Sequence, residues 1–317
     1  MCEISVVIPV RDEEKNIDEL IDRLFSVFKS MGVTFELIFV TDINRDNTVN
    51  CLLDFSNKHP NVKTIKLSNS FGQHVAVLAG LDHSAGKYIV IMDGDLQDYP
   101  EDIPLLYNKI CEGFDVVFTV KERKNDSIMR NFFSQIFNVI MNNFSDTKIS
   151  GNTSMFRIIS RKVLVEVIKF REYEPSLTYI FSYINMPTTS VPVRSGTRQH
   201  GKTKYNFFKL IDFALSSILS FSRKPLKVIS NLGLIVSIFS FVYFVIVLLQ
   251  YLFFKIEILG WATIITIVTF TGGIQLLSIG VIGEYIGRIY MQTKNRPLYI
   301  IEKKFGKFGQ DPNSNLE

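Results

Sequence analysis

A short apolar run that ends in carboxylates limits the fold of this chain more than any other feature. Residues 88–92 (YIVIM) are aromatic, β-branched or long apolar types, and the run is too short for a helix. No polar residue alternates with them, so we expect a strand buried on both faces, as in a parallel sheet. Asp93 and Asp95 follow directly, with Gly94 between them. Carboxylates two residues apart on an extended backbone point the same way, which favours Mg²⁺ or Mn²⁺. The alternative is a solvated acidic loop.

The first 120 residues alternate strands with helices. Strand patterns occupy residues 4–8, 35–40, 62–67, 88–92 and 115–120, and helical spacing of apolar residues lies between them. This alternation predicts an α/β fold with a mostly parallel, Rossmann-like sheet covered by helices on both faces. Ligands of such sheets bind beyond the carboxyl ends of the strands. Glu13, Asp42 and Asp93 all follow strand ends, so we expect them to line one cleft.

Composition and missing motifs exclude several classes of function. No Gly-rich fingerprint of a dinucleotide site or a P-loop follows any of these strands, so a metal would be the main holder of phosphate in the cleft. The net charge of +4 is too small to indicate a nucleic-acid partner. Cys2, Cys51 and Cys111 have no metal or redox spacing, which fits a reducing cytosol. The N-terminus has no basic and apolar regions of a secretory signal, so none is expected.

Two long apolar runs near the end predict a two-helix transmembrane hairpin within residues 226–287. Residues 228–254 and 258–283 contain no charged side chain. Each run exceeds the roughly 20 residues that cross a bilayer core, and a buried core is the alternative. Cations flank the pair on both sides: Arg223, Lys224, Lys227, Arg288, Lys294 and Arg296. The positive-inside rule therefore predicts a multi-pass protein of the inner membrane, with a cytosolic domain at 1–205 and a cytosolic tail at 288–317.

Two further features of this region concern the membrane. Residues 206–225 have an apolar face, with Lys209 and Asp212 on the polar side, and predict a helix lying in the membrane interface. Packing against the domain is the alternative. Small residues on one side of the second run suit close helix packing, within the hairpin or in a homo-oligomer: Gly272, Gly273, Gly280, Gly283 and Gly287.

Four motifs occur in order along the chain: residues 8–14 (IPVRDEE), 40–42 (VTD), 93–98 (DGDLQD) with Pro100 and Glu101, and 198–204 (RQHGKTK). Together, in this order, they resemble the inverting family 2 glycosyltransferases of the polyprenyl-phosphate sugar synthase type. The resemblance extends over nearly the whole chain, to about residue 305. Residues 71–74 (FGQH), 154–157 (SMFR) and 200–205 (HGKTKY) look most like the branch that transfers 4-deoxy-4-formamido-arabinose. The sequence of the hairpin resembles that of bacterial members of the family, which favours undecaprenyl phosphate over dolichyl phosphate as the acceptor.

The resemblance implies a GT-A domain that passes a sugar from a nucleotide-sugar, UDP-linked in our expectation, to a polyprenyl phosphate. Such transfer serves cell-envelope glycan synthesis or lipopolysaccharide modification. The residues that would hold the nucleotide-sugar are Pro9, Arg11, Glu13, Asp42, Gln73 and Asp93. Those that would hold the acceptor phosphate are Arg130, Ser134, Arg157, Arg198 and Lys202. Asp95 and Gln97 would bind Mg²⁺ or Mn²⁺ on the diphosphate, and Asp93, Asp95 and Arg198 would act in catalysis.

The chain departs from the family pattern at three places. Arg11-Asp12 replaces the usual Tyr-Asn, and Ile43-Asn44 replaces Gly-Ser. Met155 stands where many relatives have an aspartate that is proposed as the base. A phosphate monoester is already largely a dianion at neutral pH, because its second pKa is about 6, so attack on the sugar needs no base.

Two other functions are compatible with parts of this pattern. A processive polysaccharide synthase would carry a Gln-x-x-Arg-Trp motif, but the only tryptophan, Trp261, opens the second apolar run. A membrane scaffold without catalysis would explain the three departures, but Asp93, Asp95 and Gln97 are intact. Residues 175–211 contain several cations and no Asp or Glu, which suits an anionic lipid headgroup.

Overall fold

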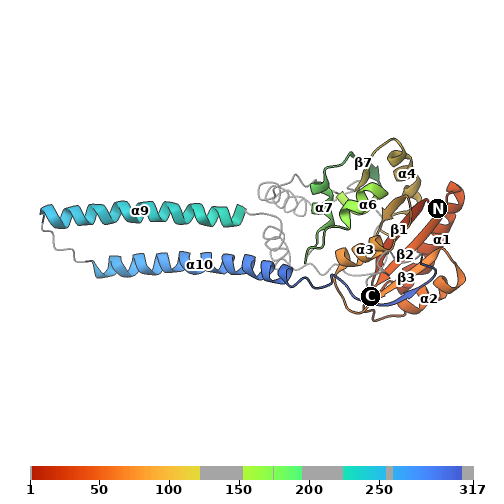
Figure 1. Ribbon diagram of the computed structural model, residues 1–317, viewed down its shortest axis with the longest axis horizontal. Coiled ribbons are helices and arrows are strands. Elements are labelled where there is room, and N and C mark those ends of the chain that lie inside the picture. Colours follow the sequence, from red (N-terminus) through yellow and green to blue (C-terminus); the bar gives the residue numbers. More distant parts are fainter. Residues whose placement is uncertain (1, 122–152, 174, 195–223, 255–259, 309–317) are drawn as a thin grey trace. The chain divides into compact units, whose positions relative to one another are not determined.

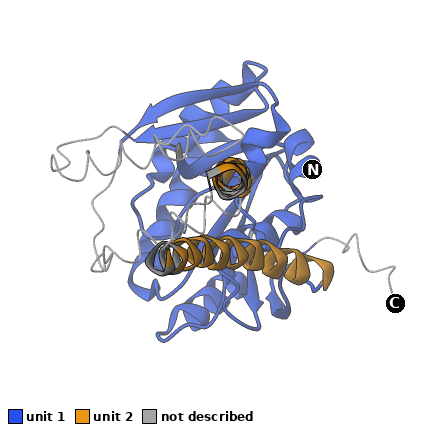
Figure 2. Ribbon diagram, turned by 90° about the vertical axis from the view of Figure 1, so that its left-hand side faces the viewer, with its two compact units in different colours: residues 1–138, 147–204, 296–317 blue, residues 139–146, 205–295 orange. Residues whose placement is uncertain are grey.

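The computed structural model describes residues 2–121, 153–173, 175–194, 224–254 and 260–308. The chain divides into two compact units, coloured separately in Figure 2. Unit 1 comprises residues 1–138, 147–204 and 296–317, and unit 2 comprises residues 139–146 and 205–295. Unit 1 is therefore built from segments on both sides of the apolar hairpin region.

Unit 1 contains an eight-stranded sheet in the order β7-β5-β6-β4-β1-β2-β3-β8. The strands are β1 (Ile4–Val10), β2 (Phe35–Thr41), β3 (Val62–Leu67), β4 (Tyr88–Ile91), β5 (Val116–Lys121), β6 (Thr153–Ser160), β7 (Thr188–Val193) and β8 (Ile301–Phe305). The central strands β4, β1, β2 and β3 are parallel, as is the pair β5 and β7. Strand β6 runs antiparallel to β4 and β5, and β8 runs antiparallel to β3. The mostly parallel α/β sheet expected from the sequence is confirmed, and β6, β7 and β8 are additions that the sequence patterns did not predict.

Helices cover both faces of this sheet (Figure 1). On one face the apolar core includes side chains of α1 (Glu14–Met31), α2 (Thr48–Lys58) and α4 (Ile103–Cys111), which follows the short helix η1 (Pro100–Asp102). On the other face lie α3 (Gln73–Asp82), α6 (Arg161–Val167) and α7 (Leu177–Ile184). Helix α1 shows why these segments are helical: its buried side chains recur every three or four residues and make one apolar stripe.

Strand β4 is buried on both faces, as its sequence predicts. Val90 and Met92 pack into the core on the α1 face, while Ile89 and Ile91 pack on the α3 face. Asp93 follows Ile91 by two residues, so the strand alternation places it on the same face, just after the end of β4. The apolar run thus carries the first carboxylate to the carboxyl edge of the sheet.

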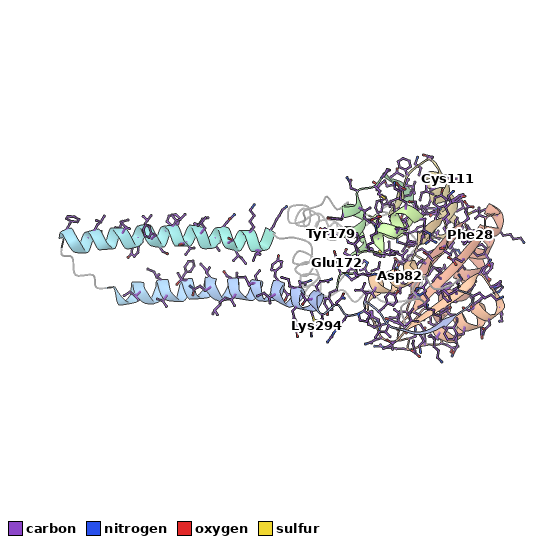
Figure 3. The ribbon with its side chains drawn as sticks, viewed as in Figure 1. Phe28, Asp82, Cys111, Glu172, Tyr179 and Lys294 are labelled. Carbon is purple, nitrogen blue, oxygen red and sulfur yellow. The ribbon has the colours of Figure 1, made fainter. Side chains whose placement is uncertain are left out.

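The segment after the hairpin returns to unit 1 and completes its sheet. Strand β8 pairs with β3, and Lys66 and Glu302 form an ion pair of 2.8 Å across the two strands. Asp82, labelled in Figure 3, is the last residue of α3. Tyr299 donates a 2.6 Å hydrogen bond to its carboxylate. Arg171 donates two further hydrogen bonds of 2.8 Å to the same carboxylate. The expected tail at 288–317 therefore contains a strand that covers the edge of the sheet.

Unit 2 contains two long helices, α9 (Lys224–Phe254) and α10 (Trp261–Thr293). In the described part of the chain, one helix has a segment long and apolar enough to cross a membrane: residues Leu226–Tyr243 of α9, with a mean hydropathy of 1.8 and none of it buried. Arg288 donates to Glu284 one turn earlier on α10, at 3.1 Å. The expected interfacial helix at 206–225 and turn at 255–259 lie almost wholly outside the described residues.

Candidate active site

The carboxyl ends of the parallel strands bring together residues that are far apart in the sequence. Arg11 follows β1 and Asp42 follows β2, and their side chains form an ion pair in which Arg11 Nε lies 3.7 Å from Asp42 Oδ1. Gln73 opens α3 beyond β3, and Asp93 follows β4; Gln73 Nε2 donates a 2.7 Å hydrogen bond to Asp93 Oδ1. The sequence predicted all four as donor-binding residues, and the structure gathers them at one edge of the sheet.

The loops after β1 and β2 hold each other through the residues that depart from the family pattern. The backbone N–H of Asp12 donates to Asn44 Oδ1 at 2.9 Å, and that of Arg45 donates to Asp12 Oδ1 at 2.6 Å. Asp12 has a φ of +56°, a left-handed conformation that aspartate tolerates better than most residues. Glu13 N–H donates to Thr48 Oγ1 at 2.9 Å. Two residues that depart from the family pattern, Asp12 and Asn44, therefore join the two loops by hydrogen bonds, which their spacing in the sequence could not show.

The part of this edge around Asp42 has spare hydrogen-bonding capacity. Asp42 Oδ1 is buried and has no hydrogen-bond partner in the described residues, because the Arg11 contact is an ion pair at longer range. Pro9 lies in β1 opposite Val40. A buried carboxylate oxygen without a hydrogen bond is costly unless a ligand completes it.

Asp98 is a site residue whose role the sequence did not reveal. Leu96 has a φ of +61°, so the chain reverses after Asp95. The reversal buries Asp98, which is 1% exposed and accepts a 3.2 Å hydrogen bond from the backbone N–H of Asp93. Lys121 at the end of β5 lies 2.9 Å from its other oxygen. The only signal for this third carboxylate was its place in the motif DGDLQD.

The three carboxylates leave excess negative charge at the end of β4. Burial and the charges of Asp98 and Asp95 raise the pKa of Asp93 to about 7, against the opposing effects of Lys121 and Gln73. Asp95 Oδ1 accepts a 3.1 Å hydrogen bond from Gln97 N–H, so the two expected metal ligands are neighbours. In the described ranges, no three or more His, Cys, Asp or Glu side chains are grouped to hold a metal. Two protein ligands are enough for Mg²⁺ when substrate phosphates supply the rest.

Arg157 is a fully buried cation beside this cluster. It lies on β6 opposite Ile91, and it is 1% exposed. Its Nε donates to Met155 O at 3.1 Å and its Nη2 donates to Ser154 O at 2.7 Å. Burial lowers the pKa of Arg157 to about 10, while the negative charges of Asp93 and Asp98 act in the opposite direction. The guanidinium therefore serves as a buried counter-charge to the carboxylates.

The rings of two phenylalanines pack against the same guanidinium. Its central carbon lies 5.1 Å from the ring centre of Phe118 and 4.9 Å from that of Phe181. These are cation–π distances, and the two rings also contact each other edge to face. The other expected acceptor residues, Arg130, Ser134, Arg198 and Lys202, lie outside the described residues.

Two protein-family models match the chain. The model described as "Glycosyl transferase family 2" matches residues 5–168, which include Asp93, Asp95, Asp98 and Arg157. The chain belongs to glycosyl transferase family 2. The model described as "GtrB C-terminal hairpin" matches residues 224–289, which span α9 and most of α10. The family resemblance and the assignment as a glycosyltransferase are thereby confirmed.

Named relatives align with this glycosyltransferase along nearly its full length. An uncharacterized glycosyltransferase of Synechocystis sp. is 36% identical over 305 residues, 96% of each chain. The SfII prophage-derived bactoprenol glucosyl transferase of Shigella flexneri is 34% identical and covers 95% of this chain and 97% of its own. The undecaprenyl-phosphate 4-deoxy-4-formamido-L-arabinose transferase of Salmonella paratyphi B is 31% identical, with 95% and 93% covered. The relatives thus include a 4-deoxy-4-formamido-arabinose transferase, the branch that the short motifs suggested, and also a glucosyl transferase.

A solved structure shares the fold of unit 1. Glucosyl-3-phosphoglycerate synthase from Mycobacterium tuberculosis, crystallised with Mn²⁺, UDP and phosphoglyceric acid, superposes with a TM-score of 0.50. The match covers 69% of this chain and 76% of that one at 16% identity. At that identity the likeness concerns the fold alone, and it confirms the GT-A architecture expected from the sequence.

Proposed function

We propose that this glycosyltransferase moves a sugar from a UDP-linked donor to undecaprenyl phosphate, with inversion at C1, for cell-envelope glycan synthesis or lipopolysaccharide modification. One observation carries the proposal: the carboxylate cluster of Asp93, Asp95 and Asp98 belongs to the same chain as the exposed apolar segment of α9. A lipid-linked acceptor is the substrate that needs both. The names of two relatives, which refer to bactoprenol and undecaprenyl phosphate, support this acceptor.

The donor would lie across the carboxyl ends of the parallel strands. Pro9, Arg11, Glu13 and Asp42 would hold the nucleoside, and Asp42 Oδ1 has the free acceptor capacity that a base or ribose hydroxyl requires. Arg11 keeps the Asp42 carboxylate in place. Gln73 orients Asp93 toward the donor through their hydrogen bond.

Asp95 and Gln97 fit a divalent cation, Mg²⁺ or Mn²⁺, bound together with the donor diphosphate. Their oxygen ligands suit these hard cations, and the crowded carboxylates around Asp93 favour added positive charge. The Mn²⁺ and UDP in the mycobacterial synthase support the same choice. A cation bound there stabilises negative charge on the diphosphate leaving group.

The acceptor phosphate would attack without help from a protein base. Antiparallel pairing joins Ile91 to Arg157, and Met155 lies two residues before Arg157 on β6. A thioether accepts no proton, so the ionised phosphate itself is the nucleophile. Arg130, Ser134, Arg198 and Lys202 would position it and offset its charge.

The membrane arrangement belongs to the same proposal. Helix α9 would cross the inner membrane, residues 258–283, most of which lie in α10, would form the second span, and the flanking cations would keep unit 1 in the cytosol. An added Cβ would have open space at the glycines of α10, so this helix could also approach a second copy of the chain.

A transfer assay tests the proposed function directly. Membranes containing the full chain are incubated with undecaprenyl phosphate, Mg²⁺ or Mn²⁺, and a panel of nucleotide-sugars that includes UDP-glucose and UDP-4-deoxy-4-formamido-arabinose. We expect one donor to yield a lipid-linked sugar, and the Asp95→Asn variant to yield at most a trace. Absence of transfer from every donor, with both metals and intact protein, would refute the proposal and favour a scaffold.

A further inference from the structure

Two buried nitrogen atoms beside Asp93 lack hydrogen-bond partners. They are His74 Nδ1 and Arg157 Nη1, and neither has a partner within the part of the chain that the structure describes. A buried polar atom left without a hydrogen bond costs about 1–3 kcal/mol, so such atoms in a cleft indicate that a ligand completes them. His74 is adjacent to Gln73, which contacts Asp93 directly.

The two side chains lie on the same face of the sheet. Ile91 packs into the apolar core that α3 and α7 cover, and Arg157 is its partner on β6, so strand alternation directs Arg157 to that face. His74 is the second residue of α3, which covers the same face. Burial lowers the pKa of His74, and the positive charge of Arg157 lowers it further. Gln73, the neighbour of His74, bonds to Asp93, and Arg157 pairs with Ile91 two residues before Asp93, so both unpartnered nitrogens lie on this face near the end of β4, in a region called the polar pocket below.

Arg157 offers this pocket a single nitrogen in a fixed position. Its Nε and Nη2 donate to backbone carbonyls of Met155 and Ser154, and the rings of Phe118 and Phe181, which contact each other, pack against the guanidinium. Of its three nitrogens, Nη1 has no partner in the described residues. Its two N–H groups have fixed directions and can bond to neighbouring ligand oxygens, whereas a phosphate group is usually held by donors from several side chains.

The surrounding charge also argues against an anionic ligand at this point. Asp93 and Asp98 lie close enough to act on the Arg157 charge, so they already balance it and would repel a phosphate. The lowered pKa of His74 keeps its imidazole neutral near pH 7. A neutral hydroxyl or amide group meets no such repulsion and can both accept from Arg157 and bond to imidazole.

We propose that Arg157 and His74 form the subsite for the transferred sugar, with Arg157 Nη1 donating to one oxygen substituent of a neutral sugar ring and His74 Nδ1 bonding to another. This rests on the proposed function, since it takes the cleft ligand to be a nucleotide-sugar. It gives Arg157 a different role from the acceptor-phosphate contact that the family resemblance implies. The pocket then selects the sugar, while Asp42 and Arg11 hold the nucleoside.

Binding measurements separate the sugar from the nucleotide. The full chain in lipid nanodiscs with Mn²⁺ is titrated calorimetrically with the donor that is active in the panel, and with the matching nucleoside diphosphate. His74→Ala and Arg157→Lys should each weaken donor binding by about tenfold, the effect of one lost hydrogen bond, with diphosphate binding unchanged within about twofold. His74→Asn should recover most of the loss, because its amide lies near the Nδ1 position.

Two controls come from the same region. His83→Ala changes the other end of α3, where His83 Nδ1 contacts Ala79 O, and Arg171→Lys changes an arginine bound to Asp82. Both should bind donor and diphosphate like the wild type. If Arg157→Lys fails to fold, the His74 variants decide the question alone, since His74 is only partly buried.

Three results have distinct meanings. Equal weakening of donor and diphosphate binding would overturn the subsite, because the residues would then act on the nucleotide. An increased KM for undecaprenyl phosphate with unchanged donor binding would also overturn it, in favour of the acceptor role. Absence of any active or bound donor with the wild type would instead refute the proposed function itself.

Discussion

Gln73, the first residue of α3, donates a 2.7 Å hydrogen bond to Asp93 at the end of β4. The contact joins the helix after β3 to the carboxylate after β4, so it fixes two of the loops that would surround the donor. It also supplies the Asp93 carboxylate with a neutral partner among like charges.

We expect Gln73→Ala to lower kcat/KM by roughly tenfold, because it removes this one positioning contact. Gln73→Glu should lower it further, since it adds a fourth carboxylate to Asp93, Asp95 and Asp98. Steady-state transfer assays with saturating metal measure both effects. Asn50→Ala, on the exposed side of α2, is the matched control and should behave like the wild type. Wild-type activity in Gln73→Glu would show that the contact has no role in catalysis.

The metal prediction concerns Asp95. Asp95→Asn should lower turnover by at least about a hundredfold, as loss of one strong transition-state contact does. Chelator should abolish wild-type activity, and Mg²⁺ or Mn²⁺ should restore it. Asp54→Asn on α2 removes an exposed carboxylate outside the cleft and should change nothing. Full wild-type activity in chelator is the result that rules out the assignment.

A buried charge network at the end of the sheet opposite the carboxylate cluster is expected to stabilise unit 1. Lys63 and Glu36 form a buried ion pair, and Glu36 also accepts from Ser5 Oγ and from the backbone N–H of Ala85. Lys63→Met should destabilise unit 1 by about 3–5 kcal/mol, because it leaves the Glu36 charge buried without its counter-ion. Chemical unfolding of the full chain in detergent, followed by far-UV circular dichroism, measures the decrease in the free energy of unfolding.

The exposed ion pair of Lys109 and Glu112 provides the comparison for that result. Lys109→Met should cost at most about 1 kcal/mol, as expected for a pair in contact with solvent. Adding Glu36→Gln to Lys63→Met should recover part of the lost stability, since the uncompensated charge is gone. Equal effects of Lys63→Met and Lys109→Met would contradict the structural role of the buried pair.

The sequence predicted what depends on local pattern and missed what depends on distant partners. Strand β4 was predictable because every side chain in it is apolar. Strand β6 was not, since Arg157 interrupts its apolar pattern, and only the distant Asp93 and Asp98 explain a buried arginine there. Strand β8 is charged because it forms an edge, and its pairing with β3 depends on a chain reversal through the whole hairpin.

Labelling of intact cells tests the membrane topology. A cysteine in place of Glu257, in the expected outer turn, should react with an impermeant thiol reagent, because the flanking cations keep the two ends inside. A cysteine in place of Lys304 on β8 should react only after permeabilisation. The exposed native Cys111 provides an internal control for the cytosolic side. The reverse labelling pattern would place the cleft away from cytosolic nucleotide-sugars.

The last prediction concerns Met155, which lies two residues before Arg157 on β6, the strand that pairs with β4. If the lipid phosphate attacks as a dianion, the rate at saturating metal should rise with the second ionisation of that phosphate, which has a pKa of about 6, and level off above about pH 7. Met155→Asp should leave turnover nearly unchanged or lower it, because a fourth carboxylate repels the nucleophile. Met155→Leu keeps the volume and should match the wild type. A gain of about tenfold or more from Met155→Asp would show that a base is missing, since general-base catalysis contributes at least that much, and the chain would then be an impaired relative.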